Sequence, residues 1–255
     1  MMFVQAKKKL GQHFLNDQNI ALKIVEAIEG QPGLVIEIGP GMGVLTQFLV
    51  KKIENFIAIE IDRESVEYLT NNNIISESKL FRQDFLRADL QNLLKNNTCI
   101  IGNLPYNISS QIFFKVLENK QQITQVVCMV QKEVAERIAE PPGSKTYGIL
   151  SVFLQAFYDI EYLFTVHEHV FTPPPKVKSA VIRLKRNWRL ELPCDEKMFF
   201  TVVKTAFNQR RKTMRNSLRP LYPPEALADP VFDKRPEQLC VEEFIELTKM
   251  LEPKD

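Results

Sequence analysis

Four consecutive residues, Asn103-Leu104-Pro105-Tyr106, follow a short apolar run at 99–102 and could carry chemistry. The exocyclic amine of adenine is a poor nucleophile, because its lone pair is delocalised into the ring. Two acceptors that take its two N–H bonds would localise the lone pair and direct it at an electrophilic methyl group. The side-chain oxygen of Asn103 and the backbone carbonyl of Leu104 are suited to this task.

The next two residues would support the same chemistry. Pro105 fixes φ near about −65° and biases Leu104 towards extended geometry, so the Leu104 carbonyl has a defined direction. Tyr106 offers a flat face for an adenine that has left its helix, a contribution of roughly 1–3 kcal/mol. The alternative is a polar turn that leaves a sheet. The chemistry needs no cysteine nucleophile and no metal ion.

Three earlier strand ends carry residues suited to an adenosine cofactor. The first predicted strand runs into EIGPGMG (37–43), whose glycines allow a sharp turn and close approach to a ligand. The second ends near Glu60 and Asp62, where a carboxylate can accept both ribose hydroxyls. Glu60 is the better candidate, because Asp62 is favoured as a helix N-cap. The third ends at Asp84, which could accept from an adenine amine or cap a helix.

These three strand ends leave the cofactor open. A glycine-rich turn serves nicotinamide dinucleotides, flavins and S-adenosylmethionine (SAM) alike, or is simply a structural turn, and the spacing GxGxG differs from the dinucleotide pattern GxGxxG. The fourth strand end decides between them. Its position after the other three favours methylation of an adenine amine, and SAM is therefore the expected cofactor.

Apolar runs and helical patterns alternate along the first part of the chain. Strands are predicted at 34–38, 56–61, 79–82, 98–102 and 125–130, with helices at 19–28, 45–52 and 64–69 between them. This order predicts a parallel sheet covered on both faces, with ligands at the carboxyl ends of its strands. Two further strands, at 158–166 and 177–185, are predicted to close the sheet as an antiparallel pair.

The fold class expected is therefore α/β, a Rossmann-like sheet followed by a small all-helical domain. We predict a catalytic domain at 1–190, including the N-terminal segment 1–18, and a helical RNA-binding domain at 191–255. The 255 residues are 45% hydrophobic, which suffices for one full core and a small appended domain.

The four cysteines are far apart and form no CxxC pair, which favours reduced thiols in a cytoplasmic protein. No run of about 18 apolar residues occurs, so no membrane segment is expected.

Basic residues are concentrated near the C-terminus, although the net charge is only +2. The segment 204–219 contains six basic residues and no acidic one. If it is helical, Lys204, Asn208, Arg211, Arg215 and Arg219 share one face. A solvated helix face is the alternative, but such faces usually mix charges of both signs. We therefore favour binding of RNA phosphates by Lys204, Arg210, Arg211, Lys212 and Arg215. Residues 7–9 form a second, smaller patch.

The sequence resembles the KsgA-type small-subunit ribosomal RNA adenine dimethyltransferases over nearly its whole length. The segments that carry the resemblance are KKKLGQHFLND (7–17), EIGPGMGVLT (37–46), IEID (59–62), GNLPYNISS (102–110), MVQKEVAERI (129–138), FTPPPKVKSAV (171–181) and AFNQRRKTMRNSL (206–218). The resemblance implies SAM-dependent dimethylation of two adjacent adenines in the 3′-terminal hairpin of small-subunit ribosomal RNA, within the assembling 30S particle.

The resemblance also implies roles for individual residues. These are contacts to SAM by His13, Leu15 and Gly39, to the ribose by Glu60, to the SAM adenine by Asp84, and to the reacting amine by Asn103. Position 13 is asparagine in many relatives. The loop FTPPPKVKS is expected to hold Phe171 and Lys176 beside the pocket mouth, although a plain rigid connector is the alternative.

Two other functions remain in competition at the level of sequence. One is dimethylation of large-subunit ribosomal RNA, as in the macrolide-resistance relatives; the segments 171–181 and 206–218 favour the small-subunit type. The other is a non-catalytic RNA-binding assembly factor, against which the intact Asn103 to Tyr106 segment argues. No dimer seam stands out, so we expect a monomer.

Overall fold

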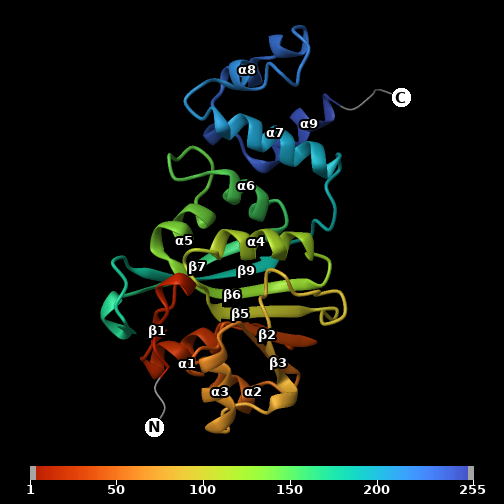
Figure 1. The fold of residues 1–255 in the computed structure, drawn as a ribbon. Helices are drawn as coiled ribbons and strands as arrows, with labels where there is room; N and C mark the ends of the chain where they lie inside the picture. The colour runs from red at the N-terminus through yellow and green to blue at the C-terminus, as the bar shows by residue number, and fades with distance from the viewer. Residues whose placement is uncertain (1–3, 252–255) are drawn as a thin grey trace. The chain divides into compact units, whose positions relative to one another are not determined.

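A mixed sheet forms the centre of the first part of the chain in the computed structural model, which describes residues 4–251. Within them, its strands are β2 (Leu34–Ile38), β3 (Phe56–Glu60), β4 (Leu80–Arg82), β5 (Thr98–Asn103), β6 (Ile123–Gln131), β7 (Tyr158–Val166) and β9 (Ser179–Arg186). Their order across the sheet is β4-β3-β2-β5-β6-β9-β7 (Figure 1). Strands β2 to β6 pair in parallel, and β9 pairs antiparallel with β6. The predicted α/β fold class is confirmed.

The sheet is covered on both faces by helices. All five residues of β2 are buried, as the unbroken run LVIEI predicts for a strand with two covered faces. One face packs in a core cluster that joins Val35 and Ile101 of the sheet to Ile24 of the first helix. The helices of this part are α1 (Gln18–Glu26), α2 (Thr46–Lys52), α3 (Arg63–Asn71), α4 (Ser109–Glu118) and α5 (Lys132–Ala139).

The chain reverses its direction across the sheet between β2 and β5. From β2 it continues to β3 and β4 on one side, and then returns to β5 on the other side of β2. In open α/β sheets, ligands bind outside the carboxyl ends of the strands at such a switch point. The topology therefore places the ends of β2 and β5 at the expected ligand site.

A second, two-stranded sheet ties the N-terminal segment to a distant loop. Strand β1 (Phe14–Leu15) pairs antiparallel with β8 (Phe171–Thr172), with Leu15 opposite Phe171. The backbone N–H of Asn16 also donates to the Val170 carbonyl at 2.8 Å. The contact joins residues more than 150 positions apart, which sequence periodicity does not indicate.

The chain divides into two compact units. The first contains residues up to 135 and 160–186, and the second contains 136–159 and the residues from 187. The second unit therefore consists of two stretches, of which one starts at 187 and the other, 136–159, lies in the range that the prediction assigned to the catalytic domain. Its helices are α6 (Ile149–Gln155), α7 (Glu196–Asn208), α8 (Met214–Ser217) and α9 (Val241–Lys249).

Short 3₁₀ helices complete the described structure. They are Lys8–Leu10, Glu77–Lys79, Glu168–Val170, Ala226–Ala228, Pro230–Asp233 and Pro236–Gln238. Among residues 4–251, no helix has both the length and the apolar character needed to cross a bilayer.

Candidate active site

One cavity at the carboxyl ends of β2, β3, β4 and β5 collects the predicted catalytic and cofactor residues. Its wall includes His13, Leu15, Gly39, Glu60, Asp84, Asn103, Leu104, Pro105 and Tyr106. All of them belong to the first unit of the chain. The structure thus brings together residues that the sequence spreads over more than 90 positions.

The glycine-rich turn after β2 forms one wall of this cavity. Gly39 and Gly41 have φ values of +65° and +56°, in the left-handed region that side chains with a Cβ rarely adopt. A Cβ at position 41 would lie 2.9 Å from the Phe14 ring. Glycine is therefore needed here both for the turn and for the close approach of the N-terminal segment.

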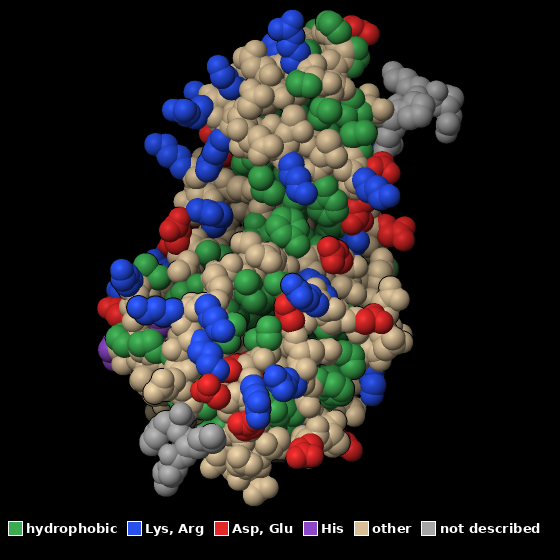
Figure 2. Space-filling view, viewed as in Figure 1, with side chains coloured by type: hydrophobic (Ala, Val, Ile, Leu, Met, Phe, Trp, Pro, Cys, Tyr) green, Lys and Arg blue, Asp and Glu red, His purple; other side chains and the backbone are tan. Residues whose placement is uncertain are grey.

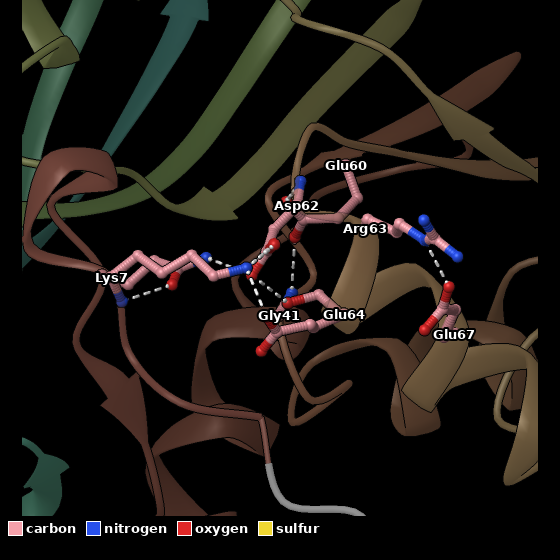
Figure 3. Close-up of polar contacts among 9 residues, drawn as sticks. Lys7, Gly41, Glu60, Asp62, Arg63, Glu64 and Glu67 are labelled. Atoms are coloured by element: carbon pink, nitrogen blue, oxygen red, sulfur yellow. Dashed lines mark hydrogen bonds and ion pairs between the residues drawn. The ribbon is translucent and has the colours of Figure 1, made fainter.

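Glu60, the candidate ribose ligand, is held rigidly at the end of β3 (Figure 3). Its Oε2 accepts from the backbone N–H of Gly41 at 3.0 Å, and its Oε1 accepts from the N–H of Asp62 at 2.8 Å. Burial raises the pKa of this carboxyl, and the two backbone hydrogen bonds oppose the rise. Because each carboxylate oxygen can accept more than one hydrogen bond, Glu60 can also bind a diol.

Asp62 precedes α3, as the N-cap prediction requires, but its side chain makes no capping hydrogen bond. Instead, Oδ1 accepts from Lys7 Nζ at 2.5 Å (Figure 3). The other oxygen, Oδ2, accepts from Gln12 Nε2 at 3.3 Å. Burial would raise the pKa of Asp62, but the hydrogen bonds from Lys7 and Gln12 outweigh burial and leave the pKa below its usual value. The N-cap prediction is therefore correct for the position of the residue and wrong for the role of its side chain.

Asp84 lies in a turn after β4 and at the cavity wall, and in the described chain no helix lies between it and β5, so the N-cap alternative is wrong. Its Oδ1 accepts from the backbone N–H of Leu86 at 2.9 Å, which closes a side-chain turn after β4. Its Oδ2 lies 3.7 Å from Arg87 Nε. The residue also lines the cavity. The turn fixes the carboxylate at the cavity wall, which leaves the ligand role as a prediction.

Asn103 is the last residue of β5, and its carboxamide is oriented by the N-terminal segment. Its Nδ2 donates to the backbone carbonyl of His13 at 2.8 Å. Since the nitrogen is held in this way, the oxygen is the free end of the amide, and it accepts no hydrogen bond within residues 4–251. The next peptide is also fixed, because the N–H of Leu104 donates to the Met129 carbonyl at 3.0 Å. The arrangement leaves a preoriented side-chain acceptor at the cavity.

Tyr106 is anchored at both its hydroxyl and its ring. The hydroxyl lies 2.5 Å from Ser179 Oγ, and burial raises its pKa while this hydrogen bond opposes the rise. The His13 ring stacks on the phenol with a centroid distance of 5.3 Å and an interplanar angle of 26°. One face of the Tyr106 ring is therefore covered by His13.

The loop after β8 reaches the site through its backbone. His13 Nδ1 lies 2.7 Å from the Pro173 carbonyl oxygen. Phe171 is buried and pairs with Leu15, whereas Lys176 is exposed, and neither lines the cavity. The described contact of this loop with the site is thus support for His13.

Glu37 and Gln12 were given no role in the sequence, and Lys7 was placed only in the basic patch 7–9, whereas the structure pairs it with Asp62. Glu37 lies within β2, 1% exposed, and its Oε2 accepts from the Thr46 hydroxyl at 2.8 Å. Burial raises its pKa to about 8. An acidic residue inside an apolar strand was a usable signal for it. Lys7 and Gln12, which bind Asp62, had no such signal, because their partner is far away in the sequence.

The basic segment of the second unit departs from the predicted single helix. Helix α7 ends at Asn208, and α8 begins only at Met214. The shared helical face predicted for the five residues from Lys204 to Arg219 is therefore wrong. Exposed cations nevertheless gather in this unit, where Figure 2 shows a row of Lys and Arg side chains along one edge.

The predicted RNA-binding residues fall into two groups. The Arg210 guanidinium donates to the Lys145 carbonyl and lies 3.9 Å from Glu237. Arg215 donates to Asp233 at 2.7 Å. Both are therefore used within the protein. The side chains of the predicted residues Lys204, Arg211 and Lys212 are exposed, as is that of the neighbouring Arg219.

Comparison with known families gives one consistent result. The model of the family described as "Ribosomal RNA adenine dimethylase" matches residues 3–251. "Ribosomal RNA small subunit methyltransferase A" of Parabacteroides distasonis is 59% identical over 251 residues, 97% of this chain and 94% of that protein. The protein of the same description from Cytophaga hutchinsonii is 59% identical over 98% of this chain and 99% of its own length.

Solved structures agree with the observed fold. A dimethyladenosine transferase from Plasmodium falciparum superposes with a TM-score of 0.79 at 23% identity, covering 92% of this chain and 96% of that one. The 23S rRNA methyltransferase ErmE gives a TM-score of 0.67 at 27% identity, covering 92% of this chain and 99% of that one.

Proposed function

Because this chain belongs to the ribosomal RNA adenine dimethylase family, we propose that its cavity binds SAM and that Asn103 and Leu104 activate the adenine amine. The protein is a SAM-dependent methyltransferase that dimethylates adenine in small-subunit ribosomal RNA. The large-subunit alternative is not supported, since the relatives at 56–59% identity are described as small-subunit enzymes.

The cavity has the features that an adenosine cofactor requires. The left-handed turn at Gly39 and Gly41 leaves the backbone accessible, and the Glu60 carboxylate is fixed at the end of the next strand. Asp84 supplies a second acceptor at the end of β4. We assign Glu60 to the ribose and Asp84 to the adenine of SAM, with His13, Leu15 and Gly39 in the same wall. When bound, SAM supplies an electrophilic methyl group.

The residues of the Asn103 to Tyr106 segment act on the other reactant. The Asn103 oxygen and the Leu104 carbonyl accept hydrogen bonds from the two N–H groups of the adenine amine. These hydrogen bonds draw the nitrogen towards tetrahedral geometry and free its lone pair. Both acceptors are fixed before the substrate arrives, so little reorganisation is needed in the transition state. Pro105 keeps the Leu104 peptide in place, and Tyr106 receives the base on the face opposite His13. The single observation that carries this assignment is the Asn103 Nδ2 hydrogen bond to His13.

The second unit supplies the phosphate contacts in this proposal. Lys204, Arg211, Lys212 and Arg219 are exposed and can each approach a phosphate. Arg210 and Arg215 support the unit from within, because their guanidinium groups are bound to Lys145 and Asp233.

The physiological substrate that fits the family is ribosomal RNA within the assembling 30S particle, at two adjacent adenines of its 3′-terminal hairpin. The protein acts there as a monomer in the cytoplasm. The supporting observation is the near full-length similarity to small-subunit methyltransferases.

The test is methyl transfer from labelled SAM to small subunits that lack the modification, followed by mass analysis of the nucleosides. Naive large subunits serve as the competing substrate. We expect N6,N6-dimethyladenosine in small-subunit RNA only. Label in large-subunit RNA, or no label in either, would contradict the proposal.

A further inference from the structure

We propose that Lys7 and Asp62 are positioning residues that hold the N-terminal strap, residues 7–16, against the cavity and thereby orient Asn103. The inference rests on the proposed function, because it concerns the residue to which we assign the activation of adenine. It adds two residues that touch neither reactant in that scheme and act through the strap.

The strap forms a continuous part of the cavity wall and is fixed at both ends. Its residues 9–15 all line the cavity. At the C-terminal end, the pairing of β1 with β8 holds it in place. At the N-terminal end, Lys7 Nζ binds Asp62 at 2.5 Å and Glu64 at 3.0 Å. The backbone N–H of Lys7 also donates to Gln12 Oε1 at 2.9 Å.

Asp62 receives two strap side chains at once. One oxygen accepts from Lys7 and the other from Gln12 Nε2 (Figure 3). Its side chain is 3% exposed, whereas that of Lys7 is 28% exposed. A carboxylate this well buried is costly to leave without its cation. Loss of the Lys7 ammonium therefore destabilises the docked strap more than loss of an exposed ion pair would.

The strap connects this anchor to the reactive amide. Gln12 is held by Asp62, and the next residue, His13, supplies the carbonyl that accepts from Asn103 Nδ2. If the N-terminal end of the strap detaches, this carbonyl is held only from the other side, by the pairing of β1 with β8 and by the contact of the His13 ring with the Pro173 carbonyl. The Asn103 amide then has a wider range of orientations, and its oxygen is less closely confined to the direction of the substrate.

The same anchor is joined to the cofactor side of the cavity. The backbone N–H of Asp62 donates to Glu60 Oε1, the carboxylate assigned to the ribose. Asp62 thus lies between the ribose ligand and the strap. The geometry predicts that one interaction affects both cofactor affinity and the activation of adenine.

The neighbouring ion pair of Arg63 with Glu67 provides a matched control. Its N···O distance is 2.6 Å, similar to that of the Lys7 pair, but the side chains are 71% and 37% exposed. The pair joins adjacent turns of α3 (Figure 3), and within residues 4–251 no hydrogen bond or ion pair links it to the strap. Removing it deletes a charge pair of the same region and leaves the strap anchor intact.

The experiment compares Lys7→Gln, Lys7→Arg, Asp62→Asn, the Lys7→Gln/Asp62→Asn double variant and Arg63→Gln. Affinity is measured by calorimetry with S-adenosylhomocysteine, and kcat and SAM KM are measured on unmethylated small subunits. For Lys7→Gln we expect about tenfold weaker binding, as for loss of one charged hydrogen bond. We also expect kcat at saturating SAM to fall about threefold or more, because a smaller fraction of the enzyme has Asn103 oriented.

The controls separate positioning from general destabilisation. Lys7→Arg should restore most of the affinity and of kcat, and Arg63→Gln should match the wild type. The double variant should lose no more than the more severe single variant, since both changes remove the same contact. Thermal unfolding should show that Lys7→Gln is less stable than Arg63→Gln but remains folded at the assay temperature.

Wild-type affinity and kcat in Lys7→Gln would overturn the inference, as would equal losses in Arg63→Gln. These results would leave the proposed function standing. Failure of the wild-type protein to bind S-adenosylhomocysteine or to methylate small subunits would instead remove the proposed function, and the inference with it.

Discussion

Replacement of Asn103 by alanine should separate turnover from binding. The change removes two interactions of the carboxamide. Its Nδ2 donates to the His13 carbonyl at 2.8 Å in the free protein, and its oxygen is assigned to the adenine amine in the transition state. The first loss weakens the strap before the reaction, whereas the second affects the barrier only.

The two losses differ in size. A neutral hydrogen bond contributes about 1 kcal/mol, which corresponds to roughly a fivefold loss of SAM affinity at most. One preorganised polar group in a transition state contributes about 3–4 kcal/mol, or roughly 10²- to 10³-fold in kcat. We therefore expect kcat to fall at least tenfold more than cofactor affinity.

The assay is single-turnover methyl transfer to unmethylated small subunits at saturating SAM, with S-adenosylhomocysteine affinity measured separately. Asn119→Ala is the matched control. Its Nδ2 also donates to a backbone carbonyl at 2.8 Å, that of Lys115, but it lies at the end of α4 and does not line the cavity. A single-turnover rate within threefold of the wild type for Asn103→Ala would refute the acceptor role.

Three other changes test different parts of the site. Glu60→Ala should weaken S-adenosylhomocysteine binding by calorimetry far more than it lowers kcat at saturating SAM, and the reverse pattern would exclude the ribose assignment. Four exposed cations near α7 predict a slope of roughly −3 to −4 when the logarithm of RNA affinity is plotted against the logarithm of salt concentration. Lys212→Gln should reduce the magnitude of this slope by about 0.7–0.9. An unchanged slope would remove Lys212 from the interface. Burial raises the pKa of Glu37 from 4.5 to about 8. Between these two pH values the folded state therefore binds more protons than the unfolded chain, and the free energy of unfolding should fall as the pH rises from 4.5 to about 8. In Glu37→Gln that part of the pH dependence should be absent from thermal unfolding, and identical profiles for both proteins would contradict a buried neutral Glu37.

The nature of the strand ends could be predicted from the sequence because the relevant information is local. A glycine-rich turn after LVIEI, a carboxylate at the end of FIAIE and an amide after TCIIG each follow a strand that its own residues specify. Parallel strands bring their carboxyl ends to one edge, so these side chains had to meet. For that reason the cavity contains the predicted residues at the strand ends, whereas His13 and Leu15 reach it from the N-terminal segment through the pairing of β1 with β8.

The prediction of the basic segment failed because charge spacing alone does not set a helix end. The helical face drawn through Lys204 and Arg215 requires a helix that continues past Asn208, where α7 ends. Nor does a cation in the sequence reveal its partner. Asp233, which binds Arg215, lies 18 residues away, in a region of 3₁₀ turns.

What the sequence determined by itself was the α/β sheet, the site at its carboxyl edge and the residues that follow each strand, because strand formation and turn chemistry depend on neighbouring residues. What only the tertiary structure decided was how those residues are held. Lys7 meets Asp62, and His13 meets Asn103, across 55 and 90 positions of the chain. Such contacts have no period and no local signal, because their partners are neighbours only in the folded chain.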